Sequence, residues 1–331
     1  MKFLLFLLSF LVLSAPVFAT PFCEELRNPA AYKKHDLDNY ALMIGGHDGY
    51  IFRSGKLHKT GYILKKDNQD IFKIFAHALK DVGTQIILVY PPHRPLVHAD
   101  KIKAKDIKSF DFTAEKQRLY RKNYNQSLED LNAGPFIAVG YDPSVSDTQL
   151  YYKTDHHWHP HLSRKIADKV ADIIKNHEFY KEIALKTLVL KVQKAKTITG
   201  VYKTSFKKIC GTALEGELIP RYQAVSDQAD PVSEQDLFED KQEDIVLIGT
   251  SNSALPKDLA NFQPFLEVAL QARIVNYAEN GDGILNPLKN YLQSESFQNH
   301  PPEFLIWEVP GYYNLNYTAR KIKEDIMPLL K

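Results

Sequence analysis

The sequence lacks most of the features that would assign it quickly to a functional class. Its 331 residues include only two cysteines, and 42 Lys and Arg nearly balance 40 Asp and Glu, which leaves a formal net charge of +2. Nucleic-acid-binding proteins usually carry a basic excess or a basic stripe, so nucleic acid is not an expected partner. No phosphate-binding glycine loop, nucleotide signature, internal repeat or low-complexity tract is present, and no cofactor is expected.

A long apolar run lies at the N-terminus. Met1 and Lys2 precede the run FLLFLLSFLVLSA at residues 3–15, and a plausible cleavage point follows Ala19. This pattern is typical of a secretory signal peptide. The run is shorter than the ~20 residues that a membrane-spanning helix needs, and an uncleaved inner-membrane anchor is the alternative. We expect a signal peptide at 1–19, export to the periplasm and a single domain over 20–331.

Export changes the interpretation of the two cysteines. Cys23 follows the expected cleavage point and Cys210 lies far downstream. An oxidising compartment permits the two thiols to pair, so we expect a disulfide between them. Two unrelated free thiols are the alternative.

Buried strands and amphipathic helices alternate along the chain. Continuous apolar strands between such helices predict a mostly parallel sheet covered on both faces, a three-layer α/β/α sandwich with ligands at the carboxyl ends of its strands. Residues 194–243 show weak periodicity, and we expect an irregular inserted lobe there. The strands are expected at 84–90, 135–140, 187–192, 244–249, 272–276 and 303–309 after a hairpin at 41–44 and 50–52. The helices are expected near 68–81, 113–132, 257–271, 284–294 and 317–330, with one more in the stretch that follows His161.

Polar and aromatic residues crowd together just ahead of one predicted helix. Asp155-His156-His157-Trp158 precedes Pro160, which suits the first turn of that helix. An Asp two residues before a His can accept the imidazole Nδ1 proton and leave Nε2 free as a base. Spacing alone does not decide between His156 and His157 as that base.

A serine follows the most apolar predicted strand. Gly249-Thr250-Ser251 comes directly after the run 244–249, and a serine on a sharp strand-to-helix turn presents its hydroxyl above the sheet edge. The backbone amide of Ser251 is an expected donor to an oxyanion. Asn252 and Asn280 are further oxyanion candidates, with simple turn chemistry as the alternative.

Two other interpretations compete for the same region. His157, His159 and His161 alternate beside Asp155, and an extended segment could aim three imidazoles at a zinc or copper ion. Helix onset at Pro160 would break that alternation, so no metal is expected. Trp158, Tyr312 and Tyr313 are candidates for stacking on sugar rings, whereas Trp307 is expected in the core because it lies in a buried strand.

The order of these motifs resembles the alginate O-acetylation proteins of the periplasm, relatives of the proteins named for a DHHW motif within the wider SGNH hydrolase-like group. Further segments resemble the family in the expected order: 46–52 (GHDGYIF), 277–283 (YAENGDG) and 306–310 (IWEVP). The resemblance runs from about residue 40 to 315. It implies an SGNH-like sandwich with a permuted motif order, in which the Asp-His pair precedes the Ser.

The resemblance also implies roles and partners. By similarity Ser251 is the nucleophile, His157 the general base and acid, and Asp155 the orienting carboxylate. The implied function is periplasmic O-acetylation of an alginate-like exopolysaccharide or other envelope glycan through an acetyl-enzyme. Acetyl-coenzyme A is not expected outside the cytoplasm, so the implied donor is a membrane-bound acyltransferase.

Two other functions are alternatives to O-acetyl transfer. An acetyl esterase with the same triad and an inactive glycan-binding or scaffold protein of a polysaccharide export assembly both fit the sequence. Gly311 and Tyr312 stand where the family commonly has an arginine, which leaves the acceptor polymer open.

Overall fold

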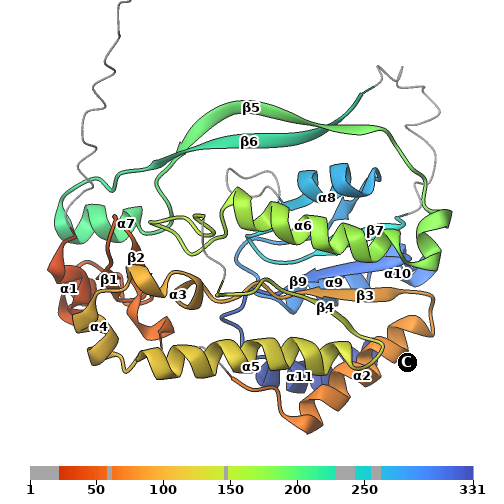
Figure 1. The fold of residues 1–331 in the computed structure, drawn as a ribbon, viewed down its shortest axis with the longest axis horizontal. Coiled ribbons are helices and arrows are strands. Elements are labelled where there is room, and N and C mark those ends of the chain that lie inside the picture. The colour runs from red at the N-terminus through yellow and green to blue at the C-terminus, as the bar shows by residue number, and fades with distance from the viewer. Residues whose placement is uncertain (1–21, 58–61, 145–147, 228–242, 255–261, 331) are drawn as a thin grey trace, which may run out of the picture.

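The centre of the fold is a five-stranded sheet in which all pairings are parallel and the strand order is β4-β3-β9-β7-β8 (Figure 1). The computed structural model describes residues 22–57, 62–144, 148–227, 243–254 and 262–330. The strands are β3 (Gln85–Val89), β4 (Ile137–Val139), β7 (Ile245–Ile248), β8 (Val275–Asn276) and β9 (Phe304–Glu308). The predicted parallel sheet is confirmed.

The inner strands are mainly apolar because both of their faces are covered; the exceptions are Gln85 at the start of β3 and Glu308 at the end of β9. Every residue of β3, β7 and β9 is buried. Ile86 and Leu88 pack into the core cluster on one face of the sheet, while Ile87 and Val89 pack into the cluster on the other. Such a sheet produces continuous hydrophobic runs instead of alternation.

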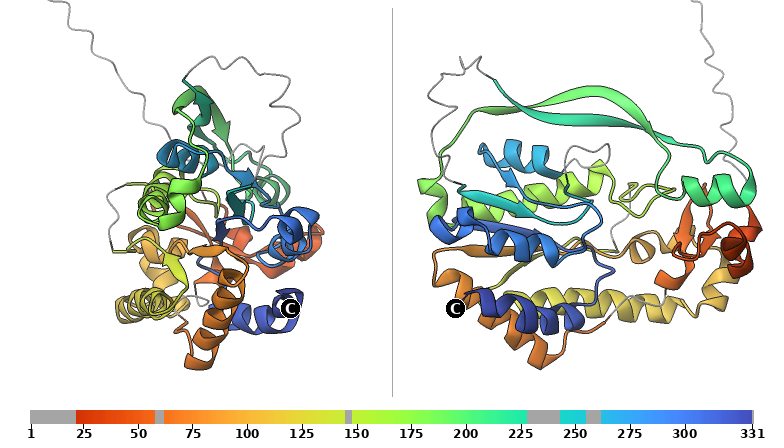
Figure 2. Two further views of the ribbon diagram at one scale, coloured as in Figure 1. Left: turned by 90° about the vertical axis from the view of Figure 1, so that its right-hand side faces the viewer. Right: turned by 180° about the vertical axis from the view of Figure 1, so that it is seen from behind.

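Helices form the two outer layers (Figures 1 and 2). Side chains of α2, α5, α9 and α11 pack into one core cluster, and those of α6 and α8 into the other. The helices are α2 (Lys66–Lys80), α5 (Ala114–Asn132), α6 (Pro160–Lys175), α8 (Phe262–Leu270), α9 (Asn286–Leu292) and α11 (Leu315–Lys321). The three-layer α/β/α sandwich is therefore confirmed. Five short helices have no counterpart in the sequence pattern: α1 (Pro29–Lys34), α3 (Arg94–Val97), α4 (Ala104–Ser109), α7 (Lys203–Ser205) and α10 (Glu295–Asn299).

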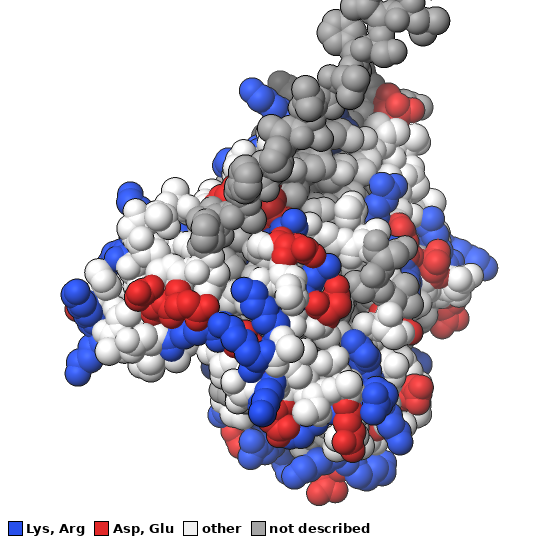
Figure 3. Space-filling model, turned by 60° about the vertical axis from the view of Figure 1, so that its left-hand side comes forward, with Lys and Arg blue, Asp and Glu red and all other residues white. Residues whose placement is uncertain are grey.

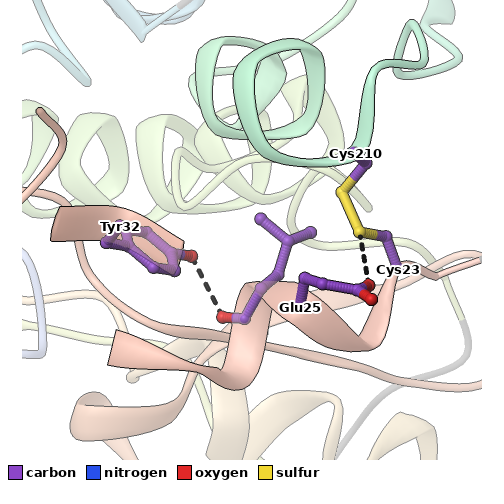
Figure 4. Close-up of a disulfide and its surroundings, with 5 residues drawn as sticks. Cys23, Glu25, Tyr32 and Cys210 are labelled. Atoms are coloured by element: carbon purple, nitrogen blue, oxygen red, sulfur yellow. Dashed lines mark hydrogen bonds between the residues drawn. A yellow bond between two sulfur atoms is a disulfide. The ribbon is translucent and has the colours of Figure 1, made fainter. Parts of the chain in front are cut away.

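A smaller lobe lies beyond the end of the sheet. The predicted hairpin is present as β1 (Met43–Gly45) and β2 (Ile51–Arg53), paired antiparallel. The expected disulfide is also present and joins Cys23 to Cys210, 187 residues apart in the sequence (Figure 4). It ties the start of the described chain to the end of a short π-helix at 206–210.

The inserted stretch is more regular than expected. Residues Leu188–Ile198 (β5) and Glu217–Ser226 (β6) form an antiparallel ribbon that arches over α8 (Figure 1). The expectation of an irregular lobe from 194 is thus wrong for these residues, and the strand expected at 187–192 belongs to the ribbon and not to the central sheet. Only two residues in each strand of the ribbon are buried, so its hydrophobic pattern is weak. The rest of the expected lobe, 228–242, lies outside the described residues.

The leader expected at 1–19 also lies outside the described residues. Within the described part of the chain, no helix has the length and hydrophobicity needed to cross a membrane.

Candidate active site

The site forms where two neighbouring parallel strands end. Strand β7 pairs with β9 up to Ile248 and Trp307, so their carboxyl ends meet at one edge of the sheet. The turn carrying Ser251 follows β7, and Glu308 is the last residue of β9. This edge is where ligands bind in open α/β sheets.

Three side chains that are distant in sequence form one hydrogen-bonded chain at this edge. The Nε2 atom of His157 lies 2.7 Å from the Ser251 Oγ, and its Nδ1 atom lies 2.5 Å from the Asp155 Oδ1. An ionised carboxylate can only accept, so Nδ1 carries the proton and Nε2 accepts the serine hydroxyl. Of the two adjacent histidines, His157 makes both of these contacts.

Backbone groups fix the Asp155 carboxylate. Its Oδ1 accepts the backbone N–H of His157 at 2.9 Å, and its Oδ2 accepts that of Val201 at 2.8 Å. The side chain is completely buried. Burial by itself would raise its pKa, but the charge and hydrogen bonds of His157 outweigh burial and hold the pKa of Asp155 below its usual value. Asp155 is therefore ionised at neutral pH.

The segment bearing His157 is closed into a tight loop. Tyr151 and Trp158 form an isolated antiparallel bridge, and the backbone N–H of His159 donates to the Leu150 carbonyl at 2.9 Å. The side chain of His159 then caps α6 by accepting the N–H of His161. The helix start at Pro160 thus holds the preceding loop over the sheet edge.

Glu308 organises the turn that carries Ser251. Its Oε2 accepts the backbone N–H and the hydroxyl of Thr250, each at 2.9 Å, and its Oε1 accepts Asn252 Nδ2 at 3.1 Å. Burial raises the pKa of the Glu308 carboxyl, while the donors on Thr250 and Asn252 oppose that shift. The motif 306–310 contains Glu308, but the sequence pattern indicates no role for it.

Trp158 does not face a ligand. It is 1% exposed, its ring lies 4.9 Å from that of Phe262, and its Nε1 donates to the backbone oxygen of Asn252 at 3.1 Å. The expectation that Trp158 stacks on a sugar ring is wrong, because its ring belongs to the core. Trp307 is fully buried, as expected.

The two asparagines lie in different surroundings. Asn252 is buried, with its amide nitrogen on Glu308 and its amide oxygen accepting the Trp158 backbone N–H at 3.3 Å, an arrangement that favours a positioning role over oxyanion binding. Asn280 is exposed and follows Glu279, whose backbone N–H donates to the Gly249 carbonyl at 3.1 Å. The loop of Asn280 therefore borders the serine turn.

A small pocket, with a cavity volume of about 30 Å³, lies beside Ser251 and His157. Asn252 and His156, the sequence neighbours of Ser251 and His157, both line it. Tyr312 forms part of its wall, with the Lys56 Nζ 4.5 Å from the centre of its ring. The lining residues are Phe52, Arg53, Lys56, Pro91, His93, Arg94, Pro95, Tyr151, His156, Tyr202, Asn252, Pro310, Gly311 and Tyr312.

The same side chains fit a proton relay better than a metal site. In the described part of the chain, Asp155, His156 and His157 are close enough together to hold a metal ion. However, both ring nitrogens of His157 are already hydrogen-bonded. An Arg53 guanidinium nitrogen lies 3.2 Å from His156 Nδ1, and its positive charge opposes a second cation there.

Comparison with known families matches residues 43–311 to the SGNH hydrolase-like domain of acetyltransferase AlgX. The chain belongs to this family. It is 27% identical over 315 residues to the alginate biosynthesis protein AlgX of Pseudomonas aeruginosa, covering 93% of this chain and 63% of that protein. It is 33% identical over 290 residues to the probable alginate O-acetylase AlgJ of the same species, covering 82% of this chain and 70% of AlgJ.

Solved structures agree with the sequence comparisons. Pseudomonas aeruginosa AlgX superposes with a TM-score of 0.72 at 26% identity, covering 89% of this chain and 67% of that chain. The O-acetyltransferase domain of Pseudomonas putida AlgJ has a TM-score of 0.63 at 19% identity, covering 85% and 98% of the two chains, which supports the shared fold. The chain spans about 63% of the AlgX sequences it matches.

Proposed function

We propose that the protein is a periplasmic serine-dependent O-acetyltransferase that acetylates an envelope glycan similar to alginate. The observation that carries the proposal is the chain of contacts from Ser251 through His157 to Asp155 at the ligand edge of the sheet. Membership of the acetyltransferase AlgX domain family supports acetyl transfer as the reaction. In this proposal residues 20–331 act as one catalytic domain.

The reaction follows from the positions of the three side chains. Ser251 Oγ attacks the acetyl carbonyl of the donor as His157 Nε2 takes the hydroxyl proton, and the departing donor oxygen receives that proton. Acetyl-Ser251 remains. A sugar hydroxyl then loses its proton to His157 and attacks the acetyl carbon, and Ser251 leaves and recovers the proton. Asp155 stabilises the imidazolium in both steps.

The charged residues of the pocket beside Ser251 are evidence for an anionic acceptor sugar. Arg53 and Lys56 place two cations in its wall. Arg94 also lines it, but its guanidinium donates to the backbone oxygens of Ile51, Tyr152 and Lys153. Charge-assisted hydrogen bonds to carboxylates suit guanidinium groups in particular. The charge of this wall therefore favours a uronate-type sugar over a neutral one. A membrane-bound acyltransferase is the proposed donor partner.

The test uses the mature protein and a chromogenic acetyl ester. Ester cleavage should fall about 10³-fold or more in Ser251→Ala, and intact-mass analysis should show an adduct of about 42 Da on the wild type alone. Ser163→Ala, which removes a buried hydroxyl from α6, is the control and should retain activity. Equal cleavage by wild type and Ser251→Ala would refute the catalytic assignment and leave a glycan-binding or scaffold role.

Transferase and esterase share the acetyl-enzyme and differ in what attacks it. Adding oligouronate to the acetylated protein should transfer the acetyl group to the sugar faster than water releases it as acetate. Mass spectrometry of the oligosaccharide measures this partition. Release of acetate alone, at a rate independent of added oligouronate, would identify an esterase.

A further inference from the structure

A buried carboxylate lies directly beneath the serine turn and has no role in the reaction steps above. Glu308 is fully buried, and burying a charge is costly unless hydrogen bonds compensate it. It accepts hydrogen bonds from the Thr250 backbone, the Thr250 hydroxyl and Asn252, with the Ser253 hydroxyl at 3.4 Å. Residues on both sides of Ser251 are thus held by one carboxylate.

The network continues to the loop that carries the base. Asn252, held by Glu308, accepts the backbone N–H of Trp158 on its side-chain oxygen at 3.3 Å and the Trp158 indole N–H on its backbone oxygen at 3.1 Å. Trp158 directly follows His157. A continuous path of hydrogen bonds therefore connects the end of β9, the serine turn and the histidine loop.

We propose that Glu308 is the positioning residue that holds Ser251 and His157 at reacting distance, by anchoring Thr250 directly and the histidine loop through Asn252. The proposal rests on the proposed function for its catalytic readout. Glu308 touches neither reacting atom. It acts by fixing the 2.7 Å contact between Ser251 Oγ and His157 Nε2.

Glycine at position 249 is part of the same arrangement. A Cβ atom there would lie 2.8 Å from Glu308 Oε2 and 2.9 Å from Glu308 Cβ. The absence of a side chain lets the carboxylate approach the turn closely enough to reach the Thr250 N–H.

Glu308→Gln is the direct test, because it preserves the shape of the side chain and removes its charge. The new amide can still accept from Thr250, but its NH₂ group meets the NH₂ group of Asn252. We expect kcat for a small acetyl ester to fall about 100-fold with KM nearly unchanged. A crystal structure should show the Ser251–His157 contact lengthened beyond hydrogen-bond distance.

Glu267→Gln is the matched control. Glu267 is a buried carboxylate of α8, hydrogen-bonded by Gln263 Nε2 and the Ile274 N–H. It is connected to the serine turn only indirectly, because Asn276 donates both to Gln263 and to the Ser253 backbone oxygen. Its substitution should leave kcat and the triad distance unchanged. An equal loss in both variants would show that removing any buried charge has this effect, and would overturn the proposal.

A double variant separates positioning from general stability. In Glu308→Gln with Asn252→Asp, the donor and acceptor exchange places across the contact, while the residue at 252 still accepts the Trp158 N–H. We expect kcat to recover about 10-fold over Glu308→Gln alone. No recovery, or wild-type kcat in Glu308→Gln, would refute the positioning role.

Two further outcomes are distinguishable. If the wild type forms no acetyl-Ser251, the proposed function fails, whereas the crystallographic distance in Glu308→Gln still decides the positioning proposal. If Glu308→Gln does not fold, Thr250→Val removes one donor from the same carboxylate and should lower kcat about 10-fold. Unchanged kcat in that variant would contradict the proposal.

Discussion

At the scale of single residues, the chemistry depends on which nitrogen of His157 carries the proton. Asp155 accepts from Nδ1 and thereby leaves Nε2 as the acceptor for the Ser251 hydroxyl. The carboxylate also accepts two backbone N–H groups, from His157 and Val201. Three donors on His157 and Val201 therefore stabilise the ionised form of Asp155.

Asp155→Asn tests this assignment. The amide can still accept the Val201 N–H, but its NH₂ group favours the tautomer of His157 that places the proton on Nε2. We expect kcat for acetyl-ester cleavage to fall about 10³-fold or more with the midpoint of thermal unfolding changed little. The measurement is a Michaelis–Menten series beside a melting curve. Retained kcat would show that His157 does not rely on this carboxylate.

The sequence predicts the three reacting side chains of the proposed site but not the residues that support them. Asp155 and Ser251 could be recognised because polar residues stand out after apolar runs and before a helix. Trp158 and Glu308 carry no such signal, since their environment depends on burial between segments far apart in the chain. Trp158 looks like a sugar-binding ring until the fold places it against Phe262.

At the scale of elements, the β5–β6 ribbon contributes to the site through the turn that follows β5. Gly200 has a φ of +71°, and a Cβ atom there would lie 2.2 Å from the Thr154 carbonyl oxygen. The next residue, Val201, donates its N–H to Asp155. The insertion thus supplies one of the groups that hold the orienting carboxylate.

Gly200→Ala should therefore damage activity as well as stability. The methyl group collides with the Thr154 backbone and displaces the Val201 N–H, so we expect kcat to fall about 10-fold or more. Gly211→Ala is the control: its φ is +69°, but nothing lies within 4 Å of the added Cβ. That variant should lose only about 1–2 kcal/mol of stability, measured by urea unfolding, and keep its kcat. Equal kcat values in the two variants would contradict this role for the turn.

Elements with a strong hydrophobic pattern are the ones that the sequence predicts best. Strands β3, β7 and β9 appear as runs of four apolar residues, and α2 and α5 begin and end within two residues of the expected bounds. The end of β5 and all of β6 were missed because only two residues of each strand are buried, which leaves little hydrophobic pattern. The short helix α3 was missed because four residues are too few to show a helical period.

At the scale of the whole molecule, several histidine rings are removed from water, and this affects how stability depends on pH. On the face drawn in Figure 3, basic and acidic side chains are intermixed. Inside, four histidines have a pKa lowered by burial, an effect reinforced by neighbouring cationic or histidine side chains: His93, His98, His156 and His159. Burial raises the pKa of the carboxylates Glu267 and Glu308, so their effect on the pH dependence of stability is opposite to that of the histidines.

Stability should consequently depend on pH through His98, and the sign follows from proton binding. Burial lowers the pKa of folded His98 to about 3, whereas an unfolded histidine titrates near 6.5. Between these values the unfolded chain binds the proton and the folded protein does not, so the free energy of unfolding falls as the pH falls. The loss from this one group is about 2 kcal/mol between pH 7 and pH 5.

His98→Gln isolates that contribution from those of the other groups. A glutamine oxygen can replace Nε2 as the acceptor of the Tyr151 backbone N–H, and it does not titrate. Urea unfolding at pH 7 and pH 5 should therefore show a loss of stability that is about 2 kcal/mol smaller in the variant than in the wild type. An identical loss in both proteins would mean that His98 stays neutral in the unfolded chain or gains its proton within the fold, and that the pH dependence arises from the other buried groups.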